Sequence, residues 1–135
     1  MYEALKKRVE REKAFHNQEQ DVSKKASDFK KLFKNYFLNP SLVEMEDYFH
    51  QVKNISNKNV LDFGCGYGKD FDDLLLKDNK LTGIDISELY IKYCTKYCNE
   101  KFPNKKFDFF AMDAHDLKFK DETFDLIIGR GILHH

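Results

Sequence analysis

The hydrophobic residues of the chain are spaced in two different ways. In the first part they recur at intervals of three and four among charged residues, as at Phe29, Phe33 and Phe37, which is typical of amphipathic helices. From residue 58 onward, short apolar runs alternate with segments long enough to be helices. We therefore predict an N-terminal helical segment over residues 1–57 and a second unit over residues 58–135.

The apolar runs of the second unit predict β-strands over residues 60–63, 81–84, 107–112 and 124–129. One helix is expected from about residue 69 to residue 76. Another is expected to follow Ser87 as its N-cap and to run to about Lys101, with Leu89, Tyr93 and Tyr97 on its inner side. Strands that alternate with helices require right-handed crossovers, so we predict an α/β fold with a parallel sheet.

The composition narrows the classes of partner and compartment. The chain has 135 residues with 23 basic and 23 acidic side chains, so no nucleic-acid partner is expected. No apolar run approaches the ~20 residues that span a bilayer, and no membrane contact is expected. Three sparse cysteines in a Lys-rich chain indicate a reducing, cytoplasmic setting. Cys94 and Cys98 would share a helix face, but no further ligands complete a metal set, and no metal is expected.

Three glycines at positions 64, 66 and 68 follow the first expected strand. Glycine tolerates positive φ and leaves no Cβ between backbone and ligand, although such a cluster can also form a plain turn. The third glycine comes one residue too early for the dinucleotide fingerprint G-x-G-x-x-G. Asp62, just before the loop, would repel a pyrophosphate but suits a ligand with an ammonium and a sulfonium group. Both features disfavour NAD and fit S-adenosylmethionine (SAM).

Asp85 ends the second expected strand, 23 residues after Asp62. An acidic side chain in that place can accept hydrogen bonds from both hydroxyls of a ribose. The alternative is a structural role at the start of the helix beside Ser87. The preceding strand, glycine loop and helix favour ribose binding.

The chain resembles the class I SAM-dependent methyltransferases, in particular the small-molecule group called methyltransferase type 11. The resemblance covers about residues 58–135 and is carried by five segments in the expected order: Asp62-Phe63-Gly64-Cys65-Gly66-Tyr67-Gly68, Leu81-Thr82-Gly83-Ile84-Asp85-Ile86-Ser87, Phe110-Ala111-Met112-Asp113-Ala114, Phe124-Asp125-Leu126-Ile127-Ile128, and Gly129-Arg130-Gly131-Ile132-Leu133-His134-His135.

The resemblance implies a role for each matching residue. The glycine loop would surround the methionine portion of SAM, with Asp62 near its ammonium group, Asp85 on the ribose and Ile86 on the adenine. Asp113 would accept from the adenine amino group, or serve as a turn residue, beside the backbone of Ala114. The cofactor-binding set is therefore Asp62, Gly64, Cys65, Gly66, Gly68, Asp85, Ile86, Asp113, Ala114 and Gly129.

The catalytic residues are left open by the resemblance. Gly129 and Arg130 would face the methyl acceptor, and Arg130 could bind an acidic acceptor or pair with a carboxylate. His134 and His135 are weak candidates for a general base, with positioning or packing as the favoured alternative. Asp125 is read as structural. Helices that precede such domains often form a lid, which makes Phe15, His16, Tyr36 and Phe37 lid candidates, although core packing is favoured for each.

The resemblance also implies a Rossmann-like three-layer sandwich with strand order 3-2-1-4-5-7-6. The sequence ends after the fourth strand, so the order expected here is 3-2-1-4, with strands 5–7 absent and the chain an incomplete fragment. The free edge of the fourth strand could pair with a second copy, a less favoured homodimer. The expected function is SAM-dependent methyl transfer to a small molecule, and the alternative is a catalytically inactive SAM-binding or protein-interaction module.

Overall fold

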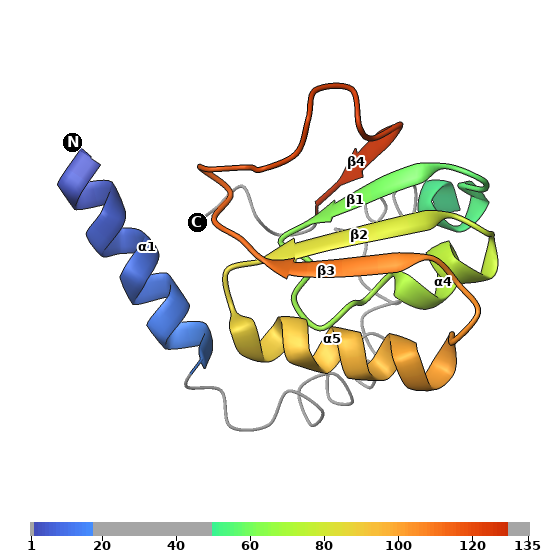
Figure 1. Ribbon diagram of the computed structural model, residues 1–135, viewed down its shortest axis with the longest axis horizontal. Coiled ribbons are helices and arrows are strands. Elements are labelled where there is room, and N and C mark those ends of the chain that lie inside the picture. Colours follow the sequence, from blue (N-terminus) through green and yellow to red (C-terminus); the bar gives the residue numbers. More distant parts are fainter. Residues whose placement is uncertain (1, 18–49, 130–135) are drawn as a thin grey trace, which may run out of the picture.

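A computed structural model describes residues 2–17 and 50–129 of the chain. The helical pattern at Phe29, Phe33 and Phe37 therefore lies outside the described residues, and residues 50–54, near the end of the predicted N-terminal helical segment, are helical. The described part contains seven labelled elements, four strands and three helices (Figure 1).

The four strands form one parallel sheet, as the sequence predicted. They are β1 (Asn59–Phe63), β2 (Lys80–Asp85), β3 (Phe107–Ala111) and β4 (Leu126–Ile128). Their order is β3-β2-β1-β4, and Figure 1 shows them side by side in that sequence. Val60 of β1 pairs with Leu81 of β2 and with Leu126 of β4, so the central strand has partners on both sides. This arrangement confirms the α/β class and the order 3-2-1-4.

Asp125 has the structural role expected of it at the start of β4. Its side-chain Oδ2 accepts from the backbone N–H of Asn59 at 2.8 Å, and its own N–H donates to the carbonyl of Asn59 at 2.9 Å. These two bonds join the beginnings of β1 and β4. They lie at the opposite end of β1 from the glycine loop.

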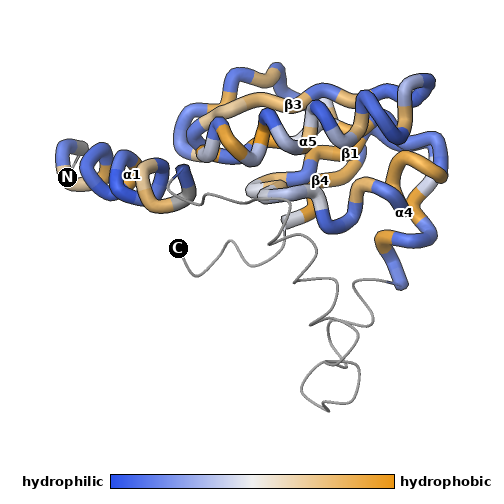
Figure 2. Tube along the Cα trace, turned by 90° about the horizontal axis from the view of Figure 1, so that it is seen from below, coloured by the Kyte–Doolittle hydropathy of each residue, from blue (hydrophilic) through white to orange (hydrophobic). Residues whose placement is uncertain are grey.

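One hydrophobic core joins the sheet to the helices α4 (Phe71–Leu76) and α5 (Glu88–Lys101). Val60, Leu81 and Ile128 contribute from one face of the sheet, and both helices pack on that face. The members with no more than 6% exposure are Val52, Val60, Cys65, Phe71, Leu74, Leu75, Leu81, Cys94, Cys98, Phe102 and Ile128. The segments labelled β1 and β3 are largely hydrophobic, whereas many of the surrounding turns are hydrophilic (Figure 2). Burial of these side chains is the main favourable term for folding.

The helix after the glycine loop begins at Phe71, two residues later than the sequence predicted. The reason is Gly68, whose φ of +77° turns the chain before the helix can start. A Cβ at Gly68 would collide with the Phe71 ring, so the close approach of this ring also requires glycine. Phe71 itself is fully buried and stacks on Phe109 of β3, with 4.8 Å between ring centroids.

Helix α5 has the expected bounds and the expected cap, but a different inner face. The Ser87 hydroxyl accepts from the N–H of Tyr90 at 3.4 Å. Tyr90, Cys94 and Cys98 are the buried residues, whereas Leu89, Tyr93 and Tyr97 are half-buried along the flanks. The prediction of the inner face was therefore wrong by about one residue in phase.

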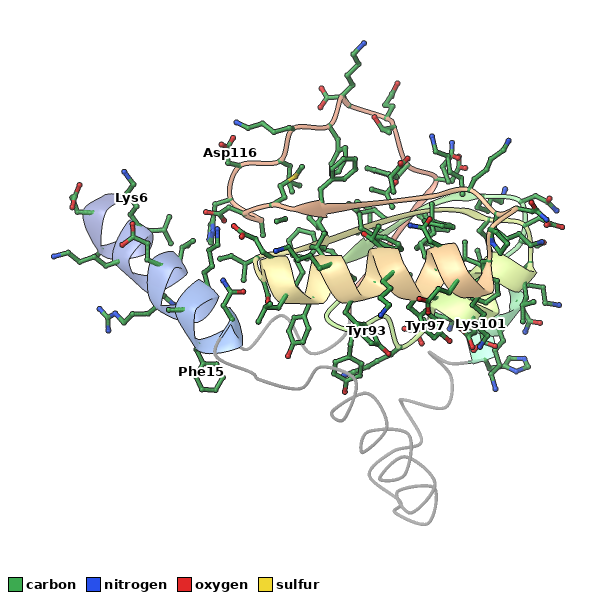
Figure 3. All side chains as sticks on the ribbon, turned by 60° about the horizontal axis from the view of Figure 1, so that its bottom comes forward. Lys6, Phe15, Tyr93, Tyr97, Lys101 and Asp116 are labelled. Carbon is green, nitrogen blue, oxygen red and sulfur yellow. The ribbon has the colours of Figure 1, made fainter. Side chains whose placement is uncertain are left out.

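The polar ends of the tyrosines explain this difference. The hydroxyl of Tyr97 lies 2.7 Å from Asp72 and 2.9 Å from the ammonium of Lys101, which also contacts Asp72. Tyr93, Tyr97 and Lys101 follow one another along the side of α5 away from the strands (Figure 3). Because the Tyr97 hydroxyl has its polar partners on the flank of α5, this side chain stays there, and the small thiols of Cys94 and Cys98 lie closest to the sheet.

Helix α1 (Tyr2–Asn17) confirms the N-terminal helix and lies beside the beginning of α5 (Figure 1). Two polar contacts join them. The Lys13 ammonium lies 2.8 Å from the Glu88 carboxylate, and the Ser87 hydroxyl donates to the Asn17 side-chain oxygen at 2.9 Å. In the described ranges, no helix has the length and apolar character needed to cross a membrane.

Candidate cofactor-binding site

A cavity of about 550 Å³ opens at the carboxyl ends of β1, β2 and β3. In open α/β sheets, ligands bind at this edge, where the strand order changes direction. The residues that line the cavity come from five places: α1, the end of β1, the glycine loop, the end of β2 with the start of α5, and the segment after β3. They are Val9, Glu12, Asp62, Phe63, Gly64, Cys65, Gly66, Tyr67, Lys69, Asp70, Ile84, Asp85, Ile86, Tyr90, Met112, Asp113, Ala114 and His115.

The glycine loop connects β1 to α4 with a left-handed backbone at each glycine. The φ angles are +69° at Gly64, +52° at Gly66 and +77° at Gly68. A Cβ at Gly66 would meet no atom within 4 Å, so this residue leaves open space beside the backbone. Gly68 is absent from the cavity lining, and its place against Phe71 shows that its main contact is with the protein core.

Asp85 reaches from the end of β2 to two backbone groups. Its Oδ2 accepts from the N–H of Gly66 at 2.9 Å, and its Oδ1 accepts from the N–H of Ser87 at 2.9 Å. Through its bond to Ser87, Asp85 thus has the structural role at the start of α5 that was the alternative to ribose binding. Its carboxylate also lines the cavity. Because a carboxylate has about four lone-pair sites, two remain for a ligand. Sequence reasoning missed the bond to Gly66, which depends on the folded path of the loop.

Asp62 is the second acidic residue of the site. It lies at the end of β1, is 6% exposed and lines the cavity. Cys65 follows in the loop, with its N–H donating to the Ile84 carbonyl at 2.9 Å. A hydrogen bond with Cys94, followed by burial, raises the pKa of the Cys65 thiol well above its usual range. The thiol is therefore neutral at physiological pH.

Asp113 and Ala114 follow β3 and also line the cavity, with His115 next to them. One carboxylate oxygen of Asp113 accepts from the N–H of His115 at 2.9 Å and lies 2.8 Å from its ring Nδ1. Partial burial acts to raise the pKa of Asp113, but these two hydrogen bonds outweigh it and lower the pKa. Asp113 therefore both forms the local turn and lines the cavity. His115 was not anticipated, although its two-residue spacing from Asp113 was a usable signal for this local bond.

Aromatic and helical residues complete the cavity without having been predicted. Tyr67 and Tyr90 meet edge to face, with ring centroids 6.1 Å apart. Val9 and Glu12 bring α1 to the cavity, whereas the lid candidate Phe15 is 67% exposed and absent from the lining. No pattern within α1 distinguishes these residues, because their position depends on the contact between α1 and α5. The other lid candidates, Tyr36 and Phe37, lie outside the described residues, as does the side chain of His16.

The acceptor-facing candidates are placed only in part. Gly129 is exposed and is not among the cavity-lining residues. Arg130, His134 and His135 lie outside the described residues. Ile86 does line the cavity, directly after Asp85.

The charge around the cavity is predominantly negative. The acidic side chains that line it are Glu12, Asp62, Asp70, Asp85 and Asp113, whereas Lys69 and His115 are the basic residues of the lining. Such a lining favours a ligand that carries positive charge and hydroxyl donors over a polyphosphate. The described residues hold no group of three or more His, Cys, Asp and Glu side chains arranged for a metal ion.

Several known proteins are similar to this chain in sequence and in fold. Residues 60–135 match a family model described as "Methyltransferase domain". Protein 235L of Invertebrate iridescent virus 6, which is named as a methyltransferase, is 34% identical over 86 residues, covering 62% of this chain and 30% of that protein. The phthiotriol/phenolphthiotriol dimycocerosates methyltransferase of Mycobacterium tuberculosis is 34% identical over 78 residues, covering 56% of this chain and 27% of that protein. The chain thus spans 30% or less of the length of these curated relatives.

Solved structures agree on the fold. A protein of Methanococcus maripaludis assigned to the SAM-dependent methyltransferases superposes with a TM-score of 0.60 at 21% identity, covering 87% of this chain and 54% of that chain. A dimethyladenosine transferase from Plasmodium falciparum superposes with a TM-score of 0.53 at 26% identity, covering 68% of this chain and 32% of that chain. Because the family model covers more than half of the sequence, from residue 60 to residue 135, the chain belongs to the class I SAM-dependent methyltransferases.

Proposed function

We propose that the chain binds SAM in the cavity at the carboxyl ends of β1, β2 and β3, as the cofactor-binding part of an enzyme that methylates a small molecule. One observation carries the proposal. The backbone of Gly66 borders open space in a cavity that is also lined by two carboxylates, Asp62 and Asp85, which suit a positively charged ligand with hydroxyl groups. The family and the acidic lining support the same cofactor.

The residues present fit the chemical groups of SAM. Asp62 would attract the ammonium group, and Asp85 has lone pairs left to accept from the ribose hydroxyls after holding Gly66 and Ser87. Ile86 would cover the adenine ring, and Asp113 would accept from the adenine amino group beside the backbone of Ala114. Each of these residues lines the same cavity.

SAM supplies a methyl group that its sulfonium already activates for displacement. The contribution of the protein is then to orient the cofactor and to keep water away from the reacting atoms. In this chain, Gly64 and Gly66 allow the loop to approach the ligand closely, and Asp85 holds the loop in that conformation. Gly129 and Arg130 would lie toward the acceptor, and His134 or His135 would take its proton if the acceptor needs a base.

We also propose a cytoplasmic setting, on the basis of the cysteines. Cys65, Cys94 and Cys98, all three cysteines of the sequence, are buried and unpaired. Free thiols are typical of proteins in reducing compartments, which supports a cytoplasmic location. The proposed setting can be tested by isolating the chain from cells under acid quench and titrating its thiols with dithionitrobenzoate. Three free thiols would support a reducing setting, and a blocked thiol would contradict it.

Calorimetric titration with SAM, its demethylated product and NAD tests the cofactor assignment. We expect both SAM and the product to bind, and NAD not to bind. Asp85→Ala should weaken SAM by about 1–3 kcal/mol, because a charged acceptor is lost. Asp116→Ala is the matched control, since Asp116 is an exposed carboxylate paired with Lys118 outside the cavity lining.

The outcomes separate the competing functions. Tight NAD binding without SAM binding would replace the methyltransferase assignment with a dinucleotide-binding one. SAM binding by a full-length protein that transfers no methyl group to any acceptor would favour the inactive binding module. Equal SAM affinity in Asp85→Ala and Asp116→Ala would exclude the ribose role of Asp85.

A further inference from the structure

Gly66 is held at both of its peptide groups by residues from different elements. Its N–H donates to Asp85 at the end of β2, at 2.9 Å. Its carbonyl oxygen accepts from the thiol of Cys94 on α5, at 3.2 Å. The Cys65 thiol lies farther from the same oxygen, at 3.9 Å. The two shorter bonds fix the peptide planes on either side of the residue that borders the open part of the cavity.

Cys94 is suited to this contact by its position and its size. It is fully buried on the inner face of α5, one turn after Tyr90 and one turn before the equally buried Cys98. A thiol is a weak donor but a real one, and a partly buried carbonyl without a partner is costly. Gly66 has a φ of +52° between two further left-handed glycines, so the loop is flexible by itself and external contacts must select its conformation.

We propose that Cys94 is a positioning residue for the cofactor: its thiol holds the Gly66 carbonyl and so keeps the glycine loop in the conformation that receives SAM. The proposal rests on the proposed function, because it deepens the account of the same site. Cys94 is not among the cavity-lining residues and acts through the loop. A core residue that belongs to neither the glycine loop nor an acidic motif would therefore influence the affinity for the cofactor.

The test compares two cysteines on one helix. Cys94→Ala and Cys98→Ala remove the same thiol from fully buried positions, yet only the first loses contacts with the loop, at the Gly66 carbonyl and at the Cys65 thiol. We expect Cys94→Ala to weaken SAM about five-fold and Cys98→Ala to leave the dissociation constant unchanged. Cys94→Ser keeps a donor at the same place and should restore the affinity to within about two-fold of the original chain.

Hydrogen–deuterium exchange of the ligand-free chain provides a second readout that needs no cofactor. Amide exchange in residues 64–68 should be faster in Cys94→Ala than in Cys98→Ala or Cys94→Ser. Equal affinities and equal exchange in the two alanine variants would overturn the proposal, as would Cys94→Ser behaving like Cys94→Ala. If the original chain does not bind SAM, the proposed function fails, and the exchange data alone then decide whether Cys94 holds the loop.

Discussion

Gly66 and Gly68 have the same left-handed backbone but different reasons to be glycine. At Gly66 a side chain would project into open space beside the cavity, whereas at Gly68 it would strike the Phe71 ring. The first glycine keeps room for a ligand, and the second keeps room for the core. Substitution at each position should therefore change a different property of the protein.

Alanine at the two positions separates folding from ligand binding. Gly68→Ala should lower the free energy of unfolding by about 2–4 kcal/mol, from backbone strain of about 1–2 kcal/mol plus crowding against Phe71. Gly66→Ala should lower it by the strain alone, about 1–2 kcal/mol. Gly66→Ala should nevertheless weaken SAM more than Gly68→Ala does, since its methyl group occupies the cavity. Urea unfolding and calorimetry measure the two effects, and the same rank order in both would contradict this division of roles.

Sequence reasoning at the residue scale was strongest where chemistry is local. Asp62, Gly66 and Asp85 were placed from their positions relative to two strands, and all three line one cavity. Their binding roles remain predictions. Tyr90 and Val9 line the cavity too, but a buried helix residue and a residue of a distant helix leave no local pattern that would assign them to it. Only the tertiary contact of α1 with α5 brings Val9 to this place.

Ser87 connects three elements, two of them through its fully buried hydroxyl and the third through its backbone N–H. The hydroxyl accepts from the Tyr90 N–H at the start of α5 and donates to Asn17 at the end of α1, while the Ser87 N–H donates to Asp85 at the end of β2. The backbone bond to Asp85 does not depend on the side chain. The cap of α5 and the attachment of α1 do.

Ser87→Ala should therefore destabilise the chain by about 1 kcal/mol, within the 0.5–2 kcal/mol typical of lost N-caps. Thr95→Ala is the matched control, because Thr95 is an exposed hydroxyl residue of the same helix whose side chain donates to the Ile91 carbonyl within α5. Removing that bond should cost little, since alanine has the higher helix propensity. Equal changes in the urea midpoint for the two variants would show that the buried hydroxyl has no special role.

The elements themselves could be predicted with good accuracy, and the errors have a common origin. The strands and their parallel pairing followed from short apolar runs separated by helices, because parallel strands need crossovers. The strand order was implied by the resemblance to the class I methyltransferases. The start of α4 was misplaced because the turn at Gly68 depends on Phe71 packing beneath it. The inner face of α5 was misplaced because Tyr97 is large but carries a hydroxyl that stays near a polar partner, Asp72.

At the scale of the whole molecule, the reactivity of Cys98 and Cys65 should distinguish opening of the core from movement of the glycine loop. Cys98 is fully buried between α5 and the sheet, and burial raises its pKa to about 12. Cys65 lies in the glycine loop with 5% exposure. Because thiolates are the reactive form, neither thiol should react quickly while the chain is folded. Reaction of the Cys98 thiol should require the core to open, whereas reaction of the Cys65 thiol should require only that the glycine loop move.

The raised pKa of Cys98 also determines how the stability of the fold changes at alkaline pH. The folded state favours the protonated form of Cys98, so its contribution to stability is complete below the ordinary pKa of 9.0 and is lost as pH rises toward about 12. Labelling at about pH 8 therefore samples the intact fold. We expect iodoacetamide and peptide mass spectrometry to show Cys65 modified faster than Cys98, with both much slower than after unfolding in urea.

SAM adds the decisive comparison. A ligand present at about 100 times its dissociation constant stabilises the bound state by about 2.7 kcal/mol, which slows labelling through any opening that destroys the site about 100-fold. Both the loop opening at Cys65 and the global opening at Cys98 destroy the cavity, so SAM should slow both reactions. Slowing at Cys98 without slowing at Cys65 would show that the glycine loop moves while SAM is bound, and would contradict its assignment to the cofactor site.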